Sequence, residues 1–94
     1  MLGPRFEDAL GYATRLHAPQ RRKGTDIPYV SHLLAVASLV LEAGGDEGEA
    51  IAALLHDGPE DQDGLETLAE IRARFGARVG DIVAACSATF EAKK

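Results

Sequence analysis

The stretch from Ile51 to Asp61 constrains the fold more than any other part of the sequence, because an apolar run leads directly into a histidine and then into a glycine–proline pair. An apolar segment of this kind favours a helix that lies in the core. Pro59 cannot continue a helical hydrogen-bond ladder and disfavours the helical conformation at Gly58, so the helix should end close by. Four side chains suited to metal binding or acid–base chemistry therefore gather at the edge of a buried layer: His56, Asp57, Glu60 and Asp61.

Apolar residues elsewhere recur at helical spacing, and no segment alternates as a half-buried strand would. Helices are predicted over these ranges: Pro4 to about His17, Pro28 to about Ala43, Asp46 to His56, Thr67 to Gly76, and about Ala77 to Thr89. Loops are predicted over Gln20–Ile27 and Asp57–Glu66. The sequence therefore predicts an all-α fold, a compact bundle of about five helices that forms a single domain over residues 1–94.

Local signals set the expected helix ends. Prolines at Pro4 and Pro28 suit the first turn of a helix, and Asp46 suits an N-cap. Thr67 with Glu70 three residues later has the pattern of a capping box, with Thr67 as the N-cap. The helix beginning near Pro28 is apolar nearly all round, so we expect it to be the central helix of the bundle.

The charge pattern is uneven. The sequence has no Lys or Arg between Lys23 and Arg72, an interval that holds eleven Asp and Glu residues. A basic group precedes it: Arg15, Arg21, Arg22 and Lys23. The pattern suggests an anionic ligand held near a divalent cation, although ordinary solvated charge explains such patterns more often.

Composition excludes several classes of protein. A net charge of −5 and a pI near 5 argue against a nucleic-acid partner. The sequence has no apolar run long enough to cross a membrane, so no membrane association is expected. Cys86 is the sole cysteine, which rules out an internal disulfide and fits a reducing, cytoplasmic setting.

His32 is the best candidate for a further metal ligand from another helix. A lone histidine on an apolar helix is more often a hydrogen-bonded core residue than a ligand. The combination of His32 with a His56–Asp57 pair at the end of a core helix is more specific, because imidazole and carboxylate ligands together suit a divalent transition metal.

The stretches His17–His32 and Leu54–Asp61 resemble the HD-domain phosphohydrolases, and more narrowly the branch that hydrolyses guanosine tetra- and pentaphosphate. The resemblance implies an all-α HD-type fold and a divalent metal cofactor, usually Mn²⁺. It implies a guanine nucleotide polyphosphate as the ligand. The implied reaction is attack of water, activated by the metal, on the 3′-pyrophosphate, with release of pyrophosphate.

The resemblance also implies residue roles. His32, His56 and Asp57 match the metal ligands of the family. Glu60 and Asp61 match the acidic pair that positions or activates the attacking water. Arg22 and Lys23 match the basic pair of the nucleotide pocket, with Arg21 as the alternative register, and Tyr29 matches a structural Pro-Tyr motif.

The family carries a further metal-ligating aspartate about half a domain later, and the sequence ends at Lys94 before such a segment. The resemblance therefore covers the N-terminal half of a hydrolase domain, and we expect exposed apolar faces and association into a homo-oligomer. Two alternatives stay open. One is an HD hydrolase of another nucleotide or phosphoester, and the other is a non-catalytic interaction or dimerisation module that retains a vestigial metal site.

Overall fold

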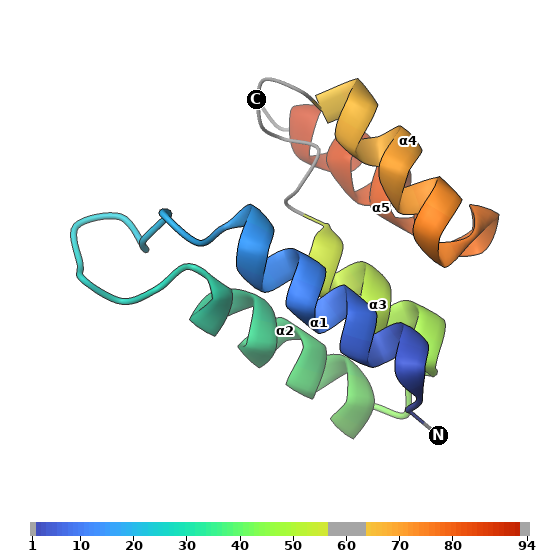
Figure 1. Cartoon of the computed structure of the whole chain (residues 1–94), viewed down its shortest axis with the longest axis horizontal. Helices are drawn as coiled ribbons and strands as arrows, with labels where there is room; N and C mark the ends of the chain where they lie inside the picture. The colour runs from blue at the N-terminus through green and yellow to red at the C-terminus, as the bar shows by residue number, and fades with distance from the viewer. Residues whose placement is uncertain (1, 57–63, 93–94) are drawn as a thin grey trace.

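The computed structural model describes residues 2–56 and 64–92, with side chains up to Ala85. These residues form five helices: α1 (Pro4–Leu16), α2 (Val30–Glu42), α3 (Glu47–Leu55), α4 (Gly64–Phe75) and α5 (Ala77–Ala92). Figure 1 shows α1, α2 and α3 lying side by side, with α4 and α5 as a second pair and a long connection between α1 and α2 projecting beyond the helices. No strand occurs in the described residues, which confirms the all-α prediction.

Short-range signals produce the helix ends that the sequence predicts. Pro4 lies in the first turn of α1. Gly44 and Gly76 adopt positive φ angles of 90° and 100° directly after α2 and α4, a conformation that glycine reaches at little steric cost. Asp46 caps α3: its carboxylate accepts from Glu49 N at 2.9 Å, while Asp46 N donates to Glu49 Oε1 at 3.0 Å. The nearby Arg78 guanidinium lowers the pKa of Asp46, which keeps the capping carboxylate ionised.

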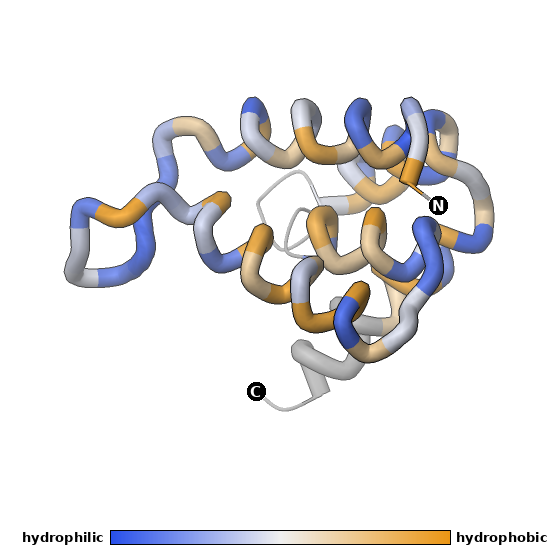
Figure 2. The backbone as a smooth tube through the Cα atoms, turned by 90° about the horizontal axis from the view of Figure 1, so that it is seen from below, coloured by the Kyte–Doolittle hydropathy of each residue, from blue (hydrophilic) through white to orange (hydrophobic). Residues whose placement is uncertain are grey.

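Helix α3 is the central helix, so the prediction that the Pro28–Ala43 helix would be central is wrong. Every residue of α3 except Glu47 and Glu49 is buried, and α3 packs against α1, α2 and α5. By contrast, Leu33 and Ala37 are the fully buried residues of α2, and Leu39 is 69% exposed. The small alanine and glycine residues of α3 let neighbours approach it closely, whereas Leu34 and Leu39 on α2 are 45% and 69% exposed. Figure 2 shows how hydrophobic and hydrophilic residues are distributed along the backbone.

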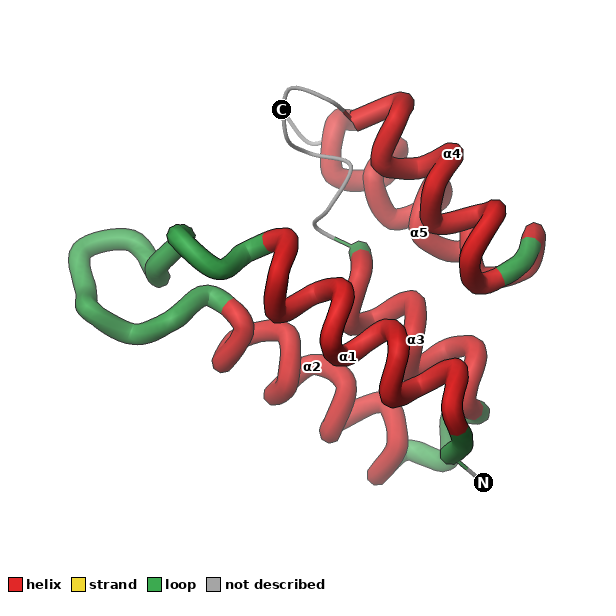
Figure 3. Tube along the Cα trace, in the orientation of Figure 1, coloured by secondary structure: helices red, strands yellow, loops and turns green. Residues whose placement is uncertain are grey.

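Two predicted helix starts are also wrong. Helix α2 begins at Val30, because Pro28 instead forms an isolated antiparallel bridge with Arg21. Helix α4 begins at Gly64, one turn before Thr67. Thr67 is therefore a residue within the helix, with a buried side chain, and it is not the N-cap. Figure 3 shows the helices in relation to the loop between α1 and α2.

Tyr12 joins α1 to α4. Its hydroxyl donates to Glu70 Oε1 at 3.0 Å, its ring meets Phe75 edge-on at 6.1 Å, and the Arg74 guanidinium lies 4.9 Å from the ring centroid. Burial, followed by the hydrogen bond and the negative charge of Glu70, raises the pKa of Tyr12 to about 12. A neutral Tyr12 therefore helps to hold α4 against α1.

Leu54 is fully buried in α3. The substitution Leu54→Ala should lower the free energy of unfolding by about 3 kcal/mol, because it leaves a cavity at the centre of the bundle. The control is Leu39→Ala on α2, where the change should stay within about 0.5 kcal/mol. Urea unfolding followed by circular dichroism measures both. Equal losses from the two variants would contradict the central position of α3.

The raised pKa of Tyr12 predicts that the protein loses stability at alkaline pH. Its pKa in the folded protein lies above the ordinary value of 10.0, so its contribution is fully present below pH 10 and is lost as the pH rises towards 12. Tyrosinate absorbance in a Tyr29→Phe background measures the pKa, and Glu70→Gln should move it back towards 10.0. An ordinary pKa for Tyr12 in that background would refute the interpretation.

Candidate functional site

His56 follows the last residue of α3, so its position is set by the buried helix before it. Its ring nitrogen Nδ1 lies 2.7 Å from Ala53 O. A carbonyl oxygen can only accept a hydrogen bond, so Nδ1 carries the proton and the lone pair of the neutral ring lies on Nε2. A backbone carbonyl bound in this way orients a histidine and fixes the tautomer that a metal ligand needs.

His32 lies in the first turn of α2, partly buried, and meets His56 across the boundary between α2 and α3. The two ring centroids are 6.2 Å apart, with an interplanar angle of 60°. The structure therefore brings His32 and His56 together, and their role as metal ligands stays a prediction. The two imidazoles thus meet at the end of α3, where the sequence predicts metal ligands.

The chemistry of the pair suits a divalent cation, because imidazole is a common metal ligand. A metal bound by an imidazole lies about 2.1 Å from the nitrogen and so about 3.2 Å from the ring centroid. Two imidazoles on a tetrahedral ion would therefore have centroids about 5.2 Å apart. The observed distance of 6.2 Å is wider, so the two rings would have to approach each other to bind one cation.

Three predicted site residues lie outside the described residues: Asp57, Glu60 and Asp61. Within the described residues, no three His, Cys, Asp or Glu side chains gather in one group. The structure therefore brings together His32 and His56, and the roles of the three carboxylates remain predictions.

The connection between α1 and α2 forms a short hairpin. Its root is closed by the hydrogen bond from Tyr29 N to Gln20 O at 2.9 Å and its middle by Arg22 N to Ile27 O at 2.9 Å. The turn closes through Thr25 N to Arg22 O at 3.0 Å, and Gly24 takes a positive φ of 75° there. We call residues 20–29 the basic hairpin, because three consecutive cations lie on it.

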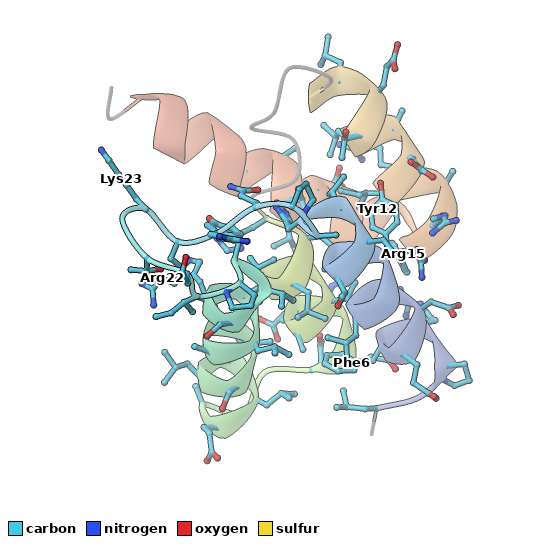
Figure 4. All side chains as sticks on the ribbon, turned by 60° about the vertical axis from the view of Figure 1, so that its left-hand side comes forward. Phe6, Tyr12, Arg15, Arg22 and Lys23 are labelled. Carbon is cyan, nitrogen blue, oxygen red and sulfur yellow. The ribbon has the colours of Figure 1, made fainter. Side chains whose placement is uncertain are left out.

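The three cations of the basic hairpin differ in their partners. Arg21 Nη1 lies 3.2 Å from Asp26 Oδ1, in an exposed ion pair. Arg22 and Lys23 have no ion-pair partner among the described side chains. Figure 4 shows both of them on the projecting loop, apart from Tyr12 and Arg15, which lie beside α4. The structure thus separates Arg21, whose charge is already paired, from its two neighbours.

The sequence analysis assigned no role to His17, which the structure places between the basic hairpin and the histidine pair. His17 is 3% exposed, and its Nδ1 lies 2.7 Å from Gln20 Oε1. Its buried Nε2 has no hydrogen-bond partner among the residues that the structure describes. Its ring centroid is 5.1 Å from that of Tyr29, which in turn is 5.6 Å from that of His32. A histidine three residues before a glutamine is too common a pattern to reveal this arrangement.

An apolar cavity of about 340 Å³ adjoins His56. It lies where α2, α3 and α5 meet, and its lining residues are Val36, Val40, Glu49, Ala52, Ala53, His56 and Ile82. The cavity and the exposed Leu39 agree with the expectation of an incompletely covered apolar face. None of the described helices is both long and apolar enough to cross a membrane.

Fold and site together define an all-α domain with a two-histidine centre at the end of its core helix. The chain belongs to the HD domain family, whose model it matches over residues 9–94. Hydrolases of this family generally depend on a divalent metal.

Three curated relatives indicate the branch of the family. A guanosine-3′,5′-bis(diphosphate) 3′-pyrophosphohydrolase from Aquifex aeolicus is 47% identical over 78 residues, which cover 83% of this chain and 11% of the relative. A GTP pyrophosphokinase from Streptomyces antibioticus is 42% identical, with 83% and 9% covered. The pyrophosphohydrolase MESH1 of Xenopus tropicalis is 40% identical, with 81% and 43% covered. The chain thus spans about a tenth of the longer relatives and less than half of MESH1.

Proposed function

We propose that this chain provides the metal centre and part of the nucleotide pocket of a guanosine polyphosphate 3′-pyrophosphohydrolase. The observation that carries the proposal is the convergence of His32 and His56, 6.2 Å apart, beside the root of a hairpin with three cations. The Aquifex and Xenopus relatives are both named as guanosine-3′,5′-bis(diphosphate) 3′-pyrophosphohydrolases, which supports this substrate class. The Streptomyces relative is named as a kinase, but this chain matches 9% of it, and a histidine pair favours metal-assisted hydrolysis.

The proposed metal ligands are His32, His56 and Asp57, and the proposed ion is Mn²⁺, which accepts a mixture of imidazole and carboxylate ligands. A divalent ion at this site would lower the pKa of a water molecule and offset charge on the phosphoryl oxygens. His56 is ready for this role, because its hydrogen bond to Ala53 O leaves Nε2 as the ligating nitrogen. Asp57, which follows His56 directly, would supply the anionic ligand.

Glu60 and Asp61 are proposed to orient the attacking water and accept its proton. The water oxygen forms a bond to the phosphorus attached to the 3′ oxygen, and the bond between that phosphorus and the 3′ oxygen breaks. The 3′ oxygen takes up a proton, and pyrophosphate is released. Both carboxylates follow the end of α3 closely, which supports their placement near the histidine pair.

Arg22 and Lys23 are proposed to bind the guanine nucleotide, whereas Arg21 is already paired with Asp26. The ion pair of Arg21 with Asp26 supports this register, since Arg22 and Lys23 keep their charges available for a ligand. A guanidinium can bind phosphate in a bidentate manner or stack on a base, and an ammonium serves as a point charge. No nucleic-acid partner is proposed, because the chain is acidic overall.

We also propose self-association through the apolar face around Leu39, which is 69% exposed beside the cavity lined by Val36 and Val40. A face of this kind favours contact with another apolar surface. A cytoplasmic location is proposed from the single cysteine of the sequence.

Removal of the His56 imidazole should abolish Mn²⁺ binding. Isothermal titration of the metal-stripped chain should give saturable binding, His56→Ala and His32→Ala should remove it, and Glu7→Gln near the start of α1 should retain it. A non-catalytic module with merely packed histidines predicts no binding by the parent chain. That result would contradict the proposed metal centre.

Substitution of Arg22 should weaken binding of guanosine tetraphosphate more than it slows the chemical step. With Mn²⁺ present, Arg22→Gln should raise KM about tenfold with little change in kcat, because it removes a charge-assisted contact of about 1.4 kcal/mol. Release of pyrophosphate and GDP gives the rates. Arg72→Gln on α4 is the charge-matched control. If Arg21→Gln gave the larger increase in KM, the alternative register would be correct.

A further inference from the structure

We propose that His17 is a positioning residue that fixes the basic hairpin relative to the histidine pair. The inference goes beyond the proposed function, and its consequence for nucleotide binding rests on that function. It starts from a histidine that is buried and lies outside the set of proposed ligands. Two contacts define its place: a hydrogen bond to Gln20 and a ring contact with Tyr29.

Gln20 is the residue on which the two ends of the basic hairpin meet. Its N–H donates to His17 O at 2.9 Å, and its carbonyl oxygen accepts from Tyr29 N at 2.9 Å. Its side-chain oxygen lies 2.7 Å from His17 Nδ1, which therefore donates to it. His17 thus holds the backbone and the side chain of the residue from which Arg21, Arg22 and Lys23 extend.

Tyr29 connects the same histidine to the metal side. The ring centroids of His17 and Tyr29 are 5.1 Å apart, and those of Tyr29 and His32 are 5.6 Å apart. Tyr29 also precedes α2 directly as its N-cap residue, so a shift of its ring would move the first turn of α2, which carries His32. The buried ring of His17 is therefore in contact with both ends of the hairpin, Gln20 and Tyr29, and lies one ring away from His32.

The surroundings of the buried Nε2 atom of His17 distinguish a positioning role from a purely structural one. Within the described part of the chain this atom has no hydrogen-bond partner, so the folded protein bears the cost of removing it from water. A phenylalanine would fill nearly the same space without that cost. The only hydrogen bond it would break involves Gln20, whose exposed side chain can bond to water instead. Stability alone therefore favours an apolar ring at this position, and the polar contact to Gln20 is what the histidine provides.

The test compares His17→Phe with His17→Asn, whose amide nitrogen can occupy the place of Nδ1 and donate to Gln20. In the phenylalanine variant, the urea midpoint should stay the same or rise, while the Kd for guanosine tetraphosphate measured with Mn²⁺ rises about tenfold. The asparagine variant should keep its Kd within about threefold of the parent. Gln20→Ala should reproduce the loss, and the double variant should add nothing further, because both changes remove one contact.

Amide hydrogen exchange measured by NMR tests the positioning without a nucleotide. The amides of Arg22 and Tyr29 should exchange faster in His17→Phe than in the parent and His17→Asn, with the amide of Leu54 unchanged. If the parent chain binds no nucleotide, the proposed function fails, and exchange at these two amides alone decides the role of His17. Unchanged exchange at both amides would overturn the proposal. The proposal would also be overturned if the urea midpoint and the affinity for the nucleotide fell together in His17→Phe and His17→Asn restored neither.

Discussion

Burial of α3 on nearly all sides is the constraint on which the candidate site depends. Every residue of this helix except Glu47 and Glu49 is buried, and three other helices pack against it. A short helix enclosed in this way cannot rotate or slide without opening cavities in a closely packed core. The residue that follows it therefore has a well-defined position, and His56 is that residue. The hydrogen bond from its ring to Ala53 O then fixes the direction of the imidazole.

The basic hairpin is positioned by a different kind of interaction. Its residues are largely exposed, so few apolar contacts hold it, and backbone hydrogen bonds at Gln20 and Arg22 determine its shape. The exposed pair of Arg21 and Asp26 adds little energy, because water screens it. The candidate site thus combines two histidines at helix ends, proposed as metal ligands, with cations on a loop whose register depends on a small number of polar contacts.

The sequence predicted the all-α fold class from apolar residues at helical spacing. It also predicted most helix ends, because proline, glycine and capping residues act locally. Pro4, Gly44, Gly76 and Asp46 lie where their backbone preferences require. The sequence did not reveal which helix is central. The all-round apolar character of α2 was mistaken for burial, although the small side chains of α3 allow closer packing. The prediction that Thr67 is an N-cap is also wrong. The pattern around Thr67 suits a cap, but its side chain is buried within α4.

The two histidines of the candidate site were predictable, because each lies on or beside a helix that is recognisable from its apolar pattern. The position of His17 was not, because it depends on the return of the chain that brings Tyr29 back to Gln20. Register matters at such a root: a slip of one residue would turn successive side chains to the opposite face. The half-buried contact between His17 and Gln20 favours one register. A histidine whose Nε2 has no partner among the described residues can therefore serve the site better than a ring that only fills the space.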